Sequence, residues 1–415
     1  MNKQRKERNR KTQKRAGLRH TEKYFKKVEN WRKEFTTDKA PEIFKMMDGE
    51  KGNLTIALNR LKNNVETGIP LDLVRDFTLI IYDYYEKRSR WSEWSELGQL
   101  GLEVCKQLND SYSLGVAYPS LCTCLGITQR MLGDRKEAMS FYQKALKQAN
   151  RHEEKTDVLT SMCDIYRLNG EIEQALECAK QAITLAKKIH DKDREAKALE
   201  YMGLAYVGDK SYDQGINCYK EALALRKQTG HLPRQAMALS YLSYALANSS
   251  YEEQNLNQAI ECYKKALEIE IKLDNYQSLG RLKGDIATAY NKLGKYEDAK
   301  ELSEDAFDYN DRIKFRRGAT LNQARLVHSY IGLKDFDKAF YSADYVCEHR
   351  KDLTAFDINN LHGLSDILLT LAQYLQGKSN TEKAKEYALI AIEFATTAED
   401  SDSLQAAQQF LQDVI

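Results

Sequence analysis

Residues 287–306 read ATAYNKLGKYEDAKELSEDA, and this stretch decides the fold. Ala287 lies one helical turn before Tyr290, and a turn at Gly294 separates this helical pattern from a second one that opens on another small residue. That small residue recurs at positions 138, 175, 215, 259, 299, 339 and 384, at spacings of 37, 40, 44, 40, 40 and 45 residues. Self-similarity at such a period predicts an array of stacked helical hairpins.

The composition favours an all-α fold. The 415 residues are 42% hydrophobic and 30% charged, so the chain can bury a core and is not wholly disordered. Only four prolines occur, and the last 182 residues contain none, whereas proline costs about 3 kcal/mol inside a helix. No apolar run approaches the roughly 20 residues that span a bilayer, and eight scattered cysteines suit a reduced compartment. We therefore expect a cytoplasmic protein.

The recurring small and aromatic positions resemble the tetratricopeptide repeat, a helix–turn–helix unit of about 34 residues. The resemblance covers residues 112–398 well and residues 70–110 weakly. It implies a right-handed α-solenoid of about seven to eight helical hairpins, in which the first helix of each hairpin lines a concave face. Most units here run near 40 residues and lack the usual terminal proline, which is similar to the longer repeats of kinesin light chain.

The sequence around the array divides the chain into five parts. We expect a basic, disordered arm at 1–20, an amphipathic helix and linker at 21–50, divergent helical hairpins at 51–110, the repeat array at 111–398 and a capping helix at 399–415.

The divergent hairpins carry a second resemblance. Residues 53–58 (NLTIAL) and 84–94 (YYEKRSRWSEW) resemble the opening of the repeat region in bacterial STAND/AfsR-like regulators. This resemblance implies a bacterial chain, related to the sensor of a signalling ATPase. The phosphate-binding motif G-x-x-x-x-G-K-[ST] of such ATPases does not occur in the sequence, so the resemblance implies a repeat array without their nucleotide-binding domain.

The sequence shows no catalytic or metal-binding constellation. Its seven histidines form no H-E-x-x-H motif, and Cys347 with His349 falls short of the four ligands of a zinc site. Cys178, Cys218 and Cys262 occupy the same position in three successive repeats, which indicates packing rather than a nucleophile. We therefore expect neither an enzyme nor a cofactor.

The inner positions of the first helices are the expected partner-binding surface. Their side chains are polar and carry both signs, and the stretch from residue 281 to 328 is the most cationic, which suggests an acidic or phosphorylated ligand. Taken singly, each of these side chains fits an ordinary solvated group better than a contact. The candidate residues are Arg130, Asp164, Arg167, Lys197, Tyr201, Tyr244, Asn248, Arg281, Asn291, Lys292, Arg325 and His328.

The N-terminus is a second candidate surface. Residues 1–33 carry fourteen Lys or Arg and three Glu, a net charge of +11, whereas the whole chain carries only +2. Clustered cations can bind nucleic-acid phosphates, but a solubilising tail, an anionic membrane surface or an acidic partner are alternatives. A nucleic-acid contact would use Lys3, Arg5, Lys6, Arg8, Arg10, Lys11, Lys14 and Arg15.

Three functions are compatible with these patterns. The first is a non-catalytic scaffold or adaptor that binds a peptide or helix of a partner protein in the concave groove. The second is a ligand- or peptide-responsive bacterial regulator of a separate effector, and the third is an RNA- or ribosome-associated factor. The sequence favours the first, because the repeat is its strongest signal, and self-association through the groove is compatible with it.

Overall fold

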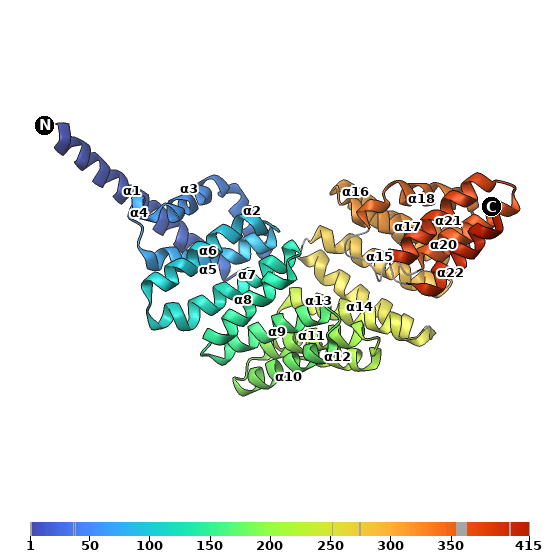
Figure 1. Cartoon of the computed structure of the whole chain (residues 1–415), viewed down its shortest axis with the longest axis horizontal. Helices are drawn as coiled ribbons and strands as arrows, with labels where there is room; N and C mark the ends of the chain where they lie inside the picture. The colour runs from blue at the N-terminus through green and yellow to red at the C-terminus, as the bar shows by residue number, and fades with distance from the viewer. Residues whose placement is uncertain are drawn as a thin grey trace. The chain divides into compact units, whose positions relative to one another are not determined.

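The computed structural model describes residues 2–35, 37, 39–250, 252–273, 275–353, 363–397 and 400–414. Within these ranges all regular structure is helical, which confirms the predicted all-α class. Successive helices pack in pairs along the chain (Figure 1). Positions 354–362 and 398 of the expected array, and positions 399 and 415 of the expected capping helix, lie outside the described residues.

The chain divides into two compact units, unit 1 (Met1–Ala245) and unit 2 (Leu246–Ile415). Unit 1 contains α1 (Asn2–Arg32), α2 (Ala40–Gly49), α3 (Lys51–Lys62), α4 (Asn64–Thr67), α5 (Leu71–Lys87), α6 (Trp91–Leu108), the π-helical turn η1 (Ser113–Ala117), α7 (Tyr118–Leu132), α8 (Arg135–Gln148), α9 (His152–Leu168), α10 (Ile172–Lys188), α11 (Lys192–Gly208) and α12 (Tyr212–Thr229). Helix α13 (Leu232–Ser249) runs across the division. Unit 2 continues with α14 (Glu253–Lys272), α15 (Tyr276–Lys292), α16 (Tyr296–Arg312), α17 (Arg316–Gly332), α18 (Phe336–Glu348), the 3-10 turn η2 (Arg350–Asp352), α20 (Leu364–Gly377), α21 (Thr381–Thr397) and α22 (Ser401–Val414).

Small residues packed against aromatic rings join the two helices of a hairpin. Gly126 of α7 faces Tyr142 of α8, and a methyl group at position 126 would overlap the tyrosine ring. In the hairpin of α11 and α12, a methyl group on Gly203 would lie 2.6 Å from Tyr219. Both tyrosines are only 1% exposed. The small and aromatic positions that recur in the sequence are therefore the places where two helix backbones come closest.

The first helices of successive hairpins also touch one another. In unit 1, α9 contacts both α7 and α11, and in unit 2, α15 contacts α17. The second helices, such as α8 and α10 or α10 and α12, make no comparably extensive contact. In a curved stack of hairpins, equivalent helices of successive hairpins lie closest together on the concave side. Helices that contact the equivalent helix of the next hairpin are therefore on that side. Within each unit, the first helices therefore form the inner face and the second helices the outer face.

The turns inside six of the hairpins share one backbone geometry, whichever residue occupies them. The first turn residue donates its N–H to the carbonyl three positions earlier, and the next residue donates to the carbonyl five positions earlier. The first residue adopts a left-handed φ, 94° at Gly133, 59° at Lys210 and 64° at Lys334. This conformation is free for glycine but costs about 1 kcal/mol for a residue with a β-carbon. The same turn recurs at Gly133, Gly170, Lys210, Gly294, Lys334 and Ser379.

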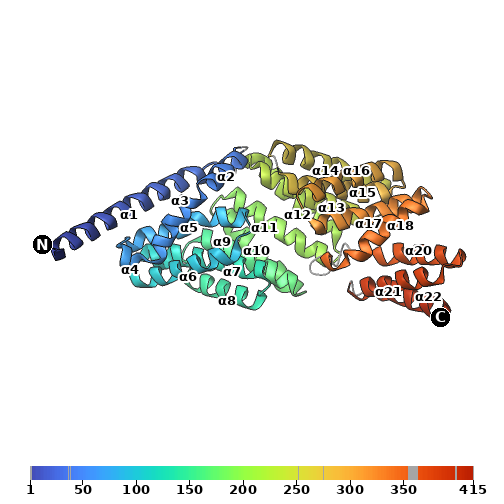
Figure 2. The ribbon, with the colours of Figure 1, turned by 90° about the horizontal axis from the view of Figure 1, so that it is seen from above.

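The N-terminal arm is helical, which corrects the expectation of a disordered segment at 1–20. Helix α1 runs without interruption from Asn2 to Arg32, because this stretch lacks proline and is rich in Lys, Arg, Gln and Glu, which favour helices. Its second half is anchored, since Tyr24, Val28 and Trp31 are buried and α1 packs on α3 and α5. The first half extends beyond the other helices of unit 1 (Figure 2). Packing of the second half therefore anchors a helix whose first half is sustained by helix-favouring residues.

Candidate partner-binding face

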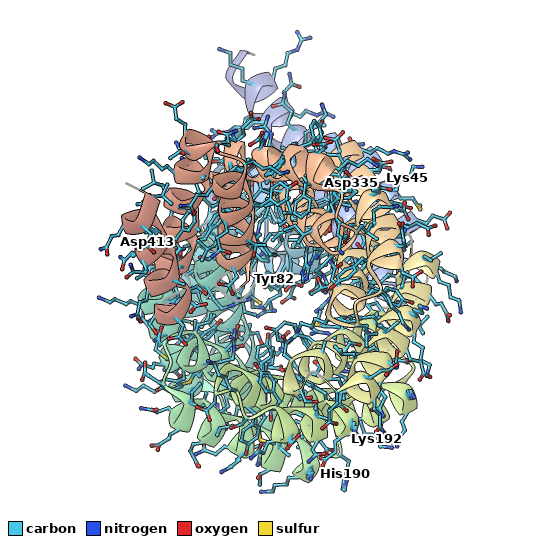
Figure 3. The ribbon with its side chains drawn as sticks, turned by 90° about the vertical axis from the view of Figure 1, so that its right-hand side faces the viewer. Lys45, Tyr82, His190, Lys192, Asp335 and Asp413 are labelled. Atoms are coloured by element: carbon cyan, nitrogen blue, oxygen red, sulfur yellow. The ribbon has the colours of Figure 1, made fainter. Side chains whose placement is uncertain are left out.

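The candidate partner-binding residues lie on the first helices of the hairpins. Figure 3 separates the two sides of unit 1, since Tyr82 of α5 lies on the inner side, whereas His190 and Lys192 lie at the outer rim, where α10 turns into α11. The candidates are distributed as Arg130 on α7, Asp164 and Arg167 on α9, Lys197 and Tyr201 on α11, Tyr244 and Asn248 on α13, Arg281, Asn291 and Lys292 on α15, and Arg325 and His328 on α17.

Three of these residues meet around one buried carboxylate in unit 1. Asp164 is 4% exposed. Arg130 reaches it from α7 at 3.3 Å, and Arg167, one turn further along α9, donates to it at 2.7 Å. Both arginine side chains keep about a quarter of their surface exposed, at 26% and 23%. The cluster of two arginines and one aspartate therefore carries a net positive charge and is partly open to solvent.

A second ion pair shows how the repeat spacing sets the neighbours. Arg194 of α11 donates to Asp157 of α9 at 2.9 Å, and these residues lie 37 positions apart. The same offset from Lys197 leads to Arg234, near the start of α13, so that one cation stands beside another. Sequence analysis missed Arg234, although the repeat offset could have identified it.

Lys197 is half-buried and has no carboxylate within ion-pair distance among the described residues. Burial lowers the pKa of its ammonium. The negative charge of Asp157 opposes this shift, the positive charge of Arg234 adds to it, and Glu86 and Glu200 oppose it more weakly. A desolvated ammonium without a close counter-ion is poorly stabilised. An incoming carboxylate or phosphate would supply the missing partner.

Arg234 and Tyr201 complete this part of the inner face. The guanidinium of Arg234 contacts Met237 Sδ at 3.8 Å, and no described carboxylate pairs with it. Burial raises the pKa of the Tyr201 phenol, so its hydroxyl stays protonated and can donate a hydrogen bond. We refer to Arg130, Arg167, Lys197, Tyr201 and Arg234 together as the cationic inner face.

In unit 2 the predicted cationic stretch is paired internally. Asp285 accepts hydrogen bonds from Arg325 at 3.0 Å and from Arg281 at 3.2 Å. Arg325 also donates to Thr288 at 2.9 Å, so it fastens α17 to α15. These guanidinium groups already have a carboxylate, and the structure gives them a role in joining neighbouring hairpins.

Lys292 and Asn291 are engaged in the same way. The Lys292 ammonium donates to the carbonyl of Ala247 at 2.8 Å and to Asn248 Oδ1 at 3.0 Å, at the end of α13. Asn291 is buried and accepts from Ser329 at 2.9 Å. Cations near a helix C-terminus stabilise its free carbonyls, so Lys292 caps α13.

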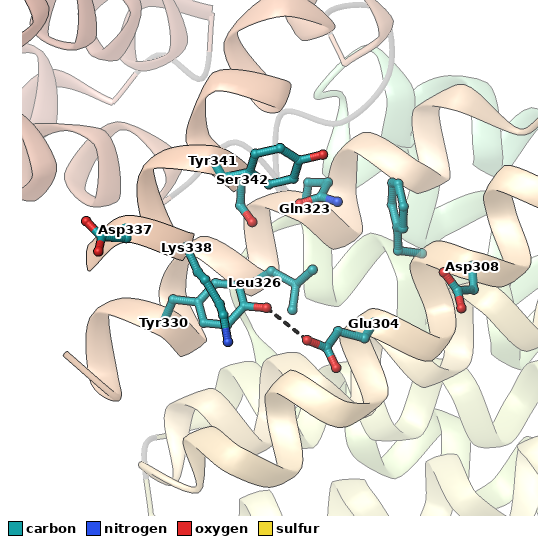
Figure 4. Close-up of a pocket in the computed structure, with 10 residues that line it drawn as sticks. Glu304, Asp308, Gln323, Leu326, Tyr330, Asp337, Lys338, Tyr341 and Ser342 are labelled. Carbon is teal, nitrogen blue, oxygen red and sulfur yellow. Dashed lines mark hydrogen bonds between the residues drawn. The ribbon is translucent and has the colours of Figure 1, made fainter. Parts of the chain in front are cut away.

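The outer side of unit 2 contains a pocket of about 370 Å³ between α16, α17 and α18 (Figure 4). Tyr330 donates to Glu304 at 2.8 Å in its wall, and Tyr341 at the rim is 74% exposed. Gln323 is 5% exposed, and its Oε1 accepts no hydrogen bond. Three lining residues are acidic and one is basic; the lining comprises Glu304, Phe307, Asp308, Gln323, Leu326, Tyr330, Asp337, Lys338, Tyr341 and Ser342.

Acidification is expected to destabilise the fold through half-buried histidines. Burial lowers the pKa of His328, whose ring centroid lies 6.2 Å from that of Tyr296, below the usual 6.5. The pKa of His231 is lowered by burial and by Arg234. The unfolded chain therefore binds more protons below pH 6.5, and the stability that the neutral rings contribute is lost as the pH falls from there toward the folded-state pKa. We expect the melting temperature to fall between pH 7.5 and 5.5, and His328→Gln to reduce that fall.

The control for this prediction is His190→Asn, in an exposed left-handed turn position that asparagine tolerates. It should retain the wild-type pH profile in scanning calorimetry. An unchanged profile for His328→Gln would contradict the assignment.

The buried cysteines act as packing residues. Burial raises the pKa of Cys105, Cys163 and Cys347 to about 12 and that of Cys122 to about 11, so these thiols stay protonated. In the part of the chain that the structure describes, no three His, Cys, Asp or Glu side chains gather as a metal site would require. None of the described helices has the length and apolarity to cross a membrane.

Comparison with protein families supports the reading of the repeats. Residues 155–228 and 236–310 match a family model described as the tetratricopeptide repeat. The photosystem I assembly protein Ycf3 of Synechococcus sp. (strain CC9605) is 32% identical over 81 residues, which is 20% of this chain and 43% of that protein. The chain thus spans less than half the length of this curated relative.

Solved structures share the fold over most of the chain. A Rap protein complexed with competence and sporulation factor has a TM-score of 0.55 at 15% identity, covering 92% of this chain and 99% of its own. A STAND protein with a tetratricopeptide repeat sensor from Pyrococcus horikoshii has a TM-score of 0.56 at 17% identity, and the match covers 86% of this chain and 55% of that protein. Aspartyl phosphate phosphatase F from Bacillus subtilis has a TM-score of 0.50 at 17% identity, and the match covers 89% of this chain and 93% of that protein. At these identities the likeness shows the fold alone.

Proposed function

Because this chain carries tetratricopeptide repeats, we propose that it is a non-catalytic interaction scaffold that binds an acidic segment of a partner protein on the cationic inner face of unit 1. Repeat stacks of this kind offer extended curved surfaces to their ligands. The observation that carries the proposal is the state of Lys197 and Arg234, two neighbouring cations for which no described carboxylate is a partner. In unit 2, by contrast, Arg281 and Arg325 share Asp285.

The chemistry of the cationic inner face suits a carboxylate ligand. Arg130 and Arg167 flank the single carboxylate of Asp164 and stay partly exposed, and Tyr201 offers a hydroxyl. Charge-assisted hydrogen bonds from such groups are about twice as strong as neutral ones. An acidic peptide or helix would therefore gain from several donors at once, and the ammonium of Lys197 would regain a counter-ion.

The double substitution Lys197→Ala/Arg234→Ala tests this proposal. We expect it to weaken partner binding at least tenfold, about 1.4 kcal/mol, with little change in melting temperature because neither side chain holds a described ion pair. Binding would be measured by quantitative mass spectrometry of partners captured on tagged wild-type and variant protein. Captured segments would then be synthesised as peptides, with a matched series in which Glu and Asp are replaced by Gln and Asn.

Lys180→Ala/Lys227→Ala is the control, because it removes the same charge from exposed positions on the outer helices α10 and α12. It should bind partners like the wild type. Equal binding by the inner-face variant, or equal binding of the amidated peptides, would refute the proposal.

A second candidate is a ligand-responsive regulator of a separate effector. It is favoured by the likeness to the Rap protein, which was solved with competence and sporulation factor and matches nearly the full length of both chains. Here a small ligand or peptide would occupy the inner face and alter the stacking of the hairpins. A shift of several degrees in melting temperature with such a ligand would favour this reading over a constitutive scaffold.

A further inference from the structure

The first half of α1 is an exposed basic helix. Side chains from Arg5 to Gln13 are all exposed, and the helix packs on the rest of unit 1 only from about Lys14 and Gly17 onward, near Gly68 and Arg60. Figure 2 shows this half of α1 extending past α3 and α4. The side chain of Lys3, one of the residues predicted to contact nucleic acid, lies outside the described residues. The remaining seven are Arg5, Lys6, Arg8, Arg10, Lys11, Lys14 and Arg15.

The charge of this segment is almost unneutralised. Its only acid is Glu7, which lies 3.5 Å from Lys11, and seven cations against this one carboxylate give residues 5–15 a net charge of +6. For the other six cations, no described carboxylate lies within ion-pair distance. Like charges one helical turn apart destabilise a helix by a few tenths of a kcal/mol per pair. A polyanion bound along the segment would remove this repulsion.

The distribution of the side chains distinguishes between polyanions. At about 100° per residue, the seven cations surround most of the helix, and only the side with Asn9 and Gln13 is free of charge. A helix that lies on a membrane needs an apolar face, but Ala16 is the only apolar residue from position 2 to 17 apart from Gly17. A helix inside a groove has phosphates on both walls, which suits cations on both flanks.

We propose that residues 5–15 bind duplex DNA by lying in its major groove, with the cations on the phosphates and Asn9 and Gln13 toward the base edges. The major groove of B-form DNA is about 12 Å wide and admits an α-helix, whereas the deep, narrow major groove of A-form RNA does not. Asparagine and glutamine are the side chains that pair with adenine edges, but the phosphate contacts supply most of the affinity. This surface is separate from the cationic inner face.

Fluorescence anisotropy with a fluorescein-labelled 20-base-pair DNA duplex tests the proposal on the full chain. Five to seven phosphate contacts predict that log K falls against log salt with a slope of about −4.5 to −6.3, since each contact contributes about −0.9. The variant Arg5→Gln/Lys6→Gln/Arg8→Gln/Arg10→Gln should reduce the slope by three to four and weaken binding at 50 mM salt at least 100-fold. Glutamine preserves helix propensity, so circular dichroism and melting temperature should not change.

The matched control removes four exposed cations from the outer helices of the same unit, as Lys180→Gln/Lys188→Gln/Lys220→Gln/Lys227→Gln. It should bind the duplex with nearly the wild-type slope. An RNA duplex of the same sequence and vesicles of phosphatidylcholine with phosphatidylserine are the competing probes. Tighter binding to either probe, a slope near zero, or undiminished binding by the α1 variant would overturn the proposal.

Discussion

Replacing Glu200 with alanine will lower the free energy of unfolding by about 3–5 kcal/mol. Glu200 of α11 and Arg226 of α12 pair at 2.9 Å, and each side chain is only 2% exposed. Removing the carboxylate leaves a buried guanidinium with Asp193 as its remaining partner, at 2.9 Å, and Asp193 is 51% exposed. Breaking a buried ion pair in this way is strongly destabilising, because one half-exposed carboxylate compensates the buried guanidinium only partly. Urea denaturation followed by circular dichroism measures the change.

The double variant Glu200→Leu/Arg226→Met distinguishes the loss of the ion pair from the cost of leaving one charge buried. Replacing both charges with apolar groups of similar size removes the desolvation cost together with the attraction, so most of the lost stability should return. A loss below 1 kcal/mol for Glu200→Ala, or a double variant no more stable than the single one, would show that the pair does not hold α12 on α11.

Gly126→Ala is the second change with a large expected effect. Helix propensity and core packing predict opposite signs for its change in the free energy of unfolding. Helix propensity alone would make alanine more stable than glycine inside α7, by about 0.5–1 kcal/mol. A β-carbon at this position overlaps the ring of Tyr142, which is 1% exposed and cannot move aside without disturbing the core. Overpacking of this kind costs about 1–3 kcal/mol, so we expect net destabilisation of about 2 kcal/mol.

Gly52→Ala is the matched control, because nothing lies within 4 Å of a methyl group at that helical position. It should raise stability slightly, as propensity predicts. In the combined variant Gly126→Ala/Tyr142→Leu the ring that causes the overlap is gone, so the two changes should cost less together than their sum. Strict additivity, or a stabilising Gly126→Ala, would contradict the close approach of α7 and α8.

The fold was predictable because its determinants recur locally. The spacing of small residues, tyrosines and turns is repeated along the sequence, and each repeat encodes one hairpin whose bare face needs a neighbour. The helix expected within residues 21–50 is present as the second half of α1, which Tyr24, Val28 and Trp31 anchor. The expectation of disorder at 1–20 was wrong, because the helix continues from that anchored half through the basic segment.

The charge partners of the inner face were only partly predictable. Asp157 with Arg194 and Asp285 with Arg325 lie 37 and 40 positions apart, close to one repeat. Equivalent positions in successive first helices are therefore neighbours, and this offset can be read from the sequence. The offset alone does not decide which cation takes the acid. Arg194 pairs with Asp157 at 37 positions, whereas Lys197, 40 positions from Asp157, makes no ion pair among the described residues.

The shared turn geometry has an evolutionary consequence. Since Lys210, Lys334 and Ser379 close the same pair of hydrogen bonds as Gly133 and Gly294, the backbone survives the loss of its most distinctive residue. Each such exchange costs about 1 kcal/mol, which is small beside the contacts that the stacked neighbours supply. Duplicated units can therefore lose the turn glycine and keep their architecture. Units of common origin then still share a fold after the sequence motif that identifies them has gone.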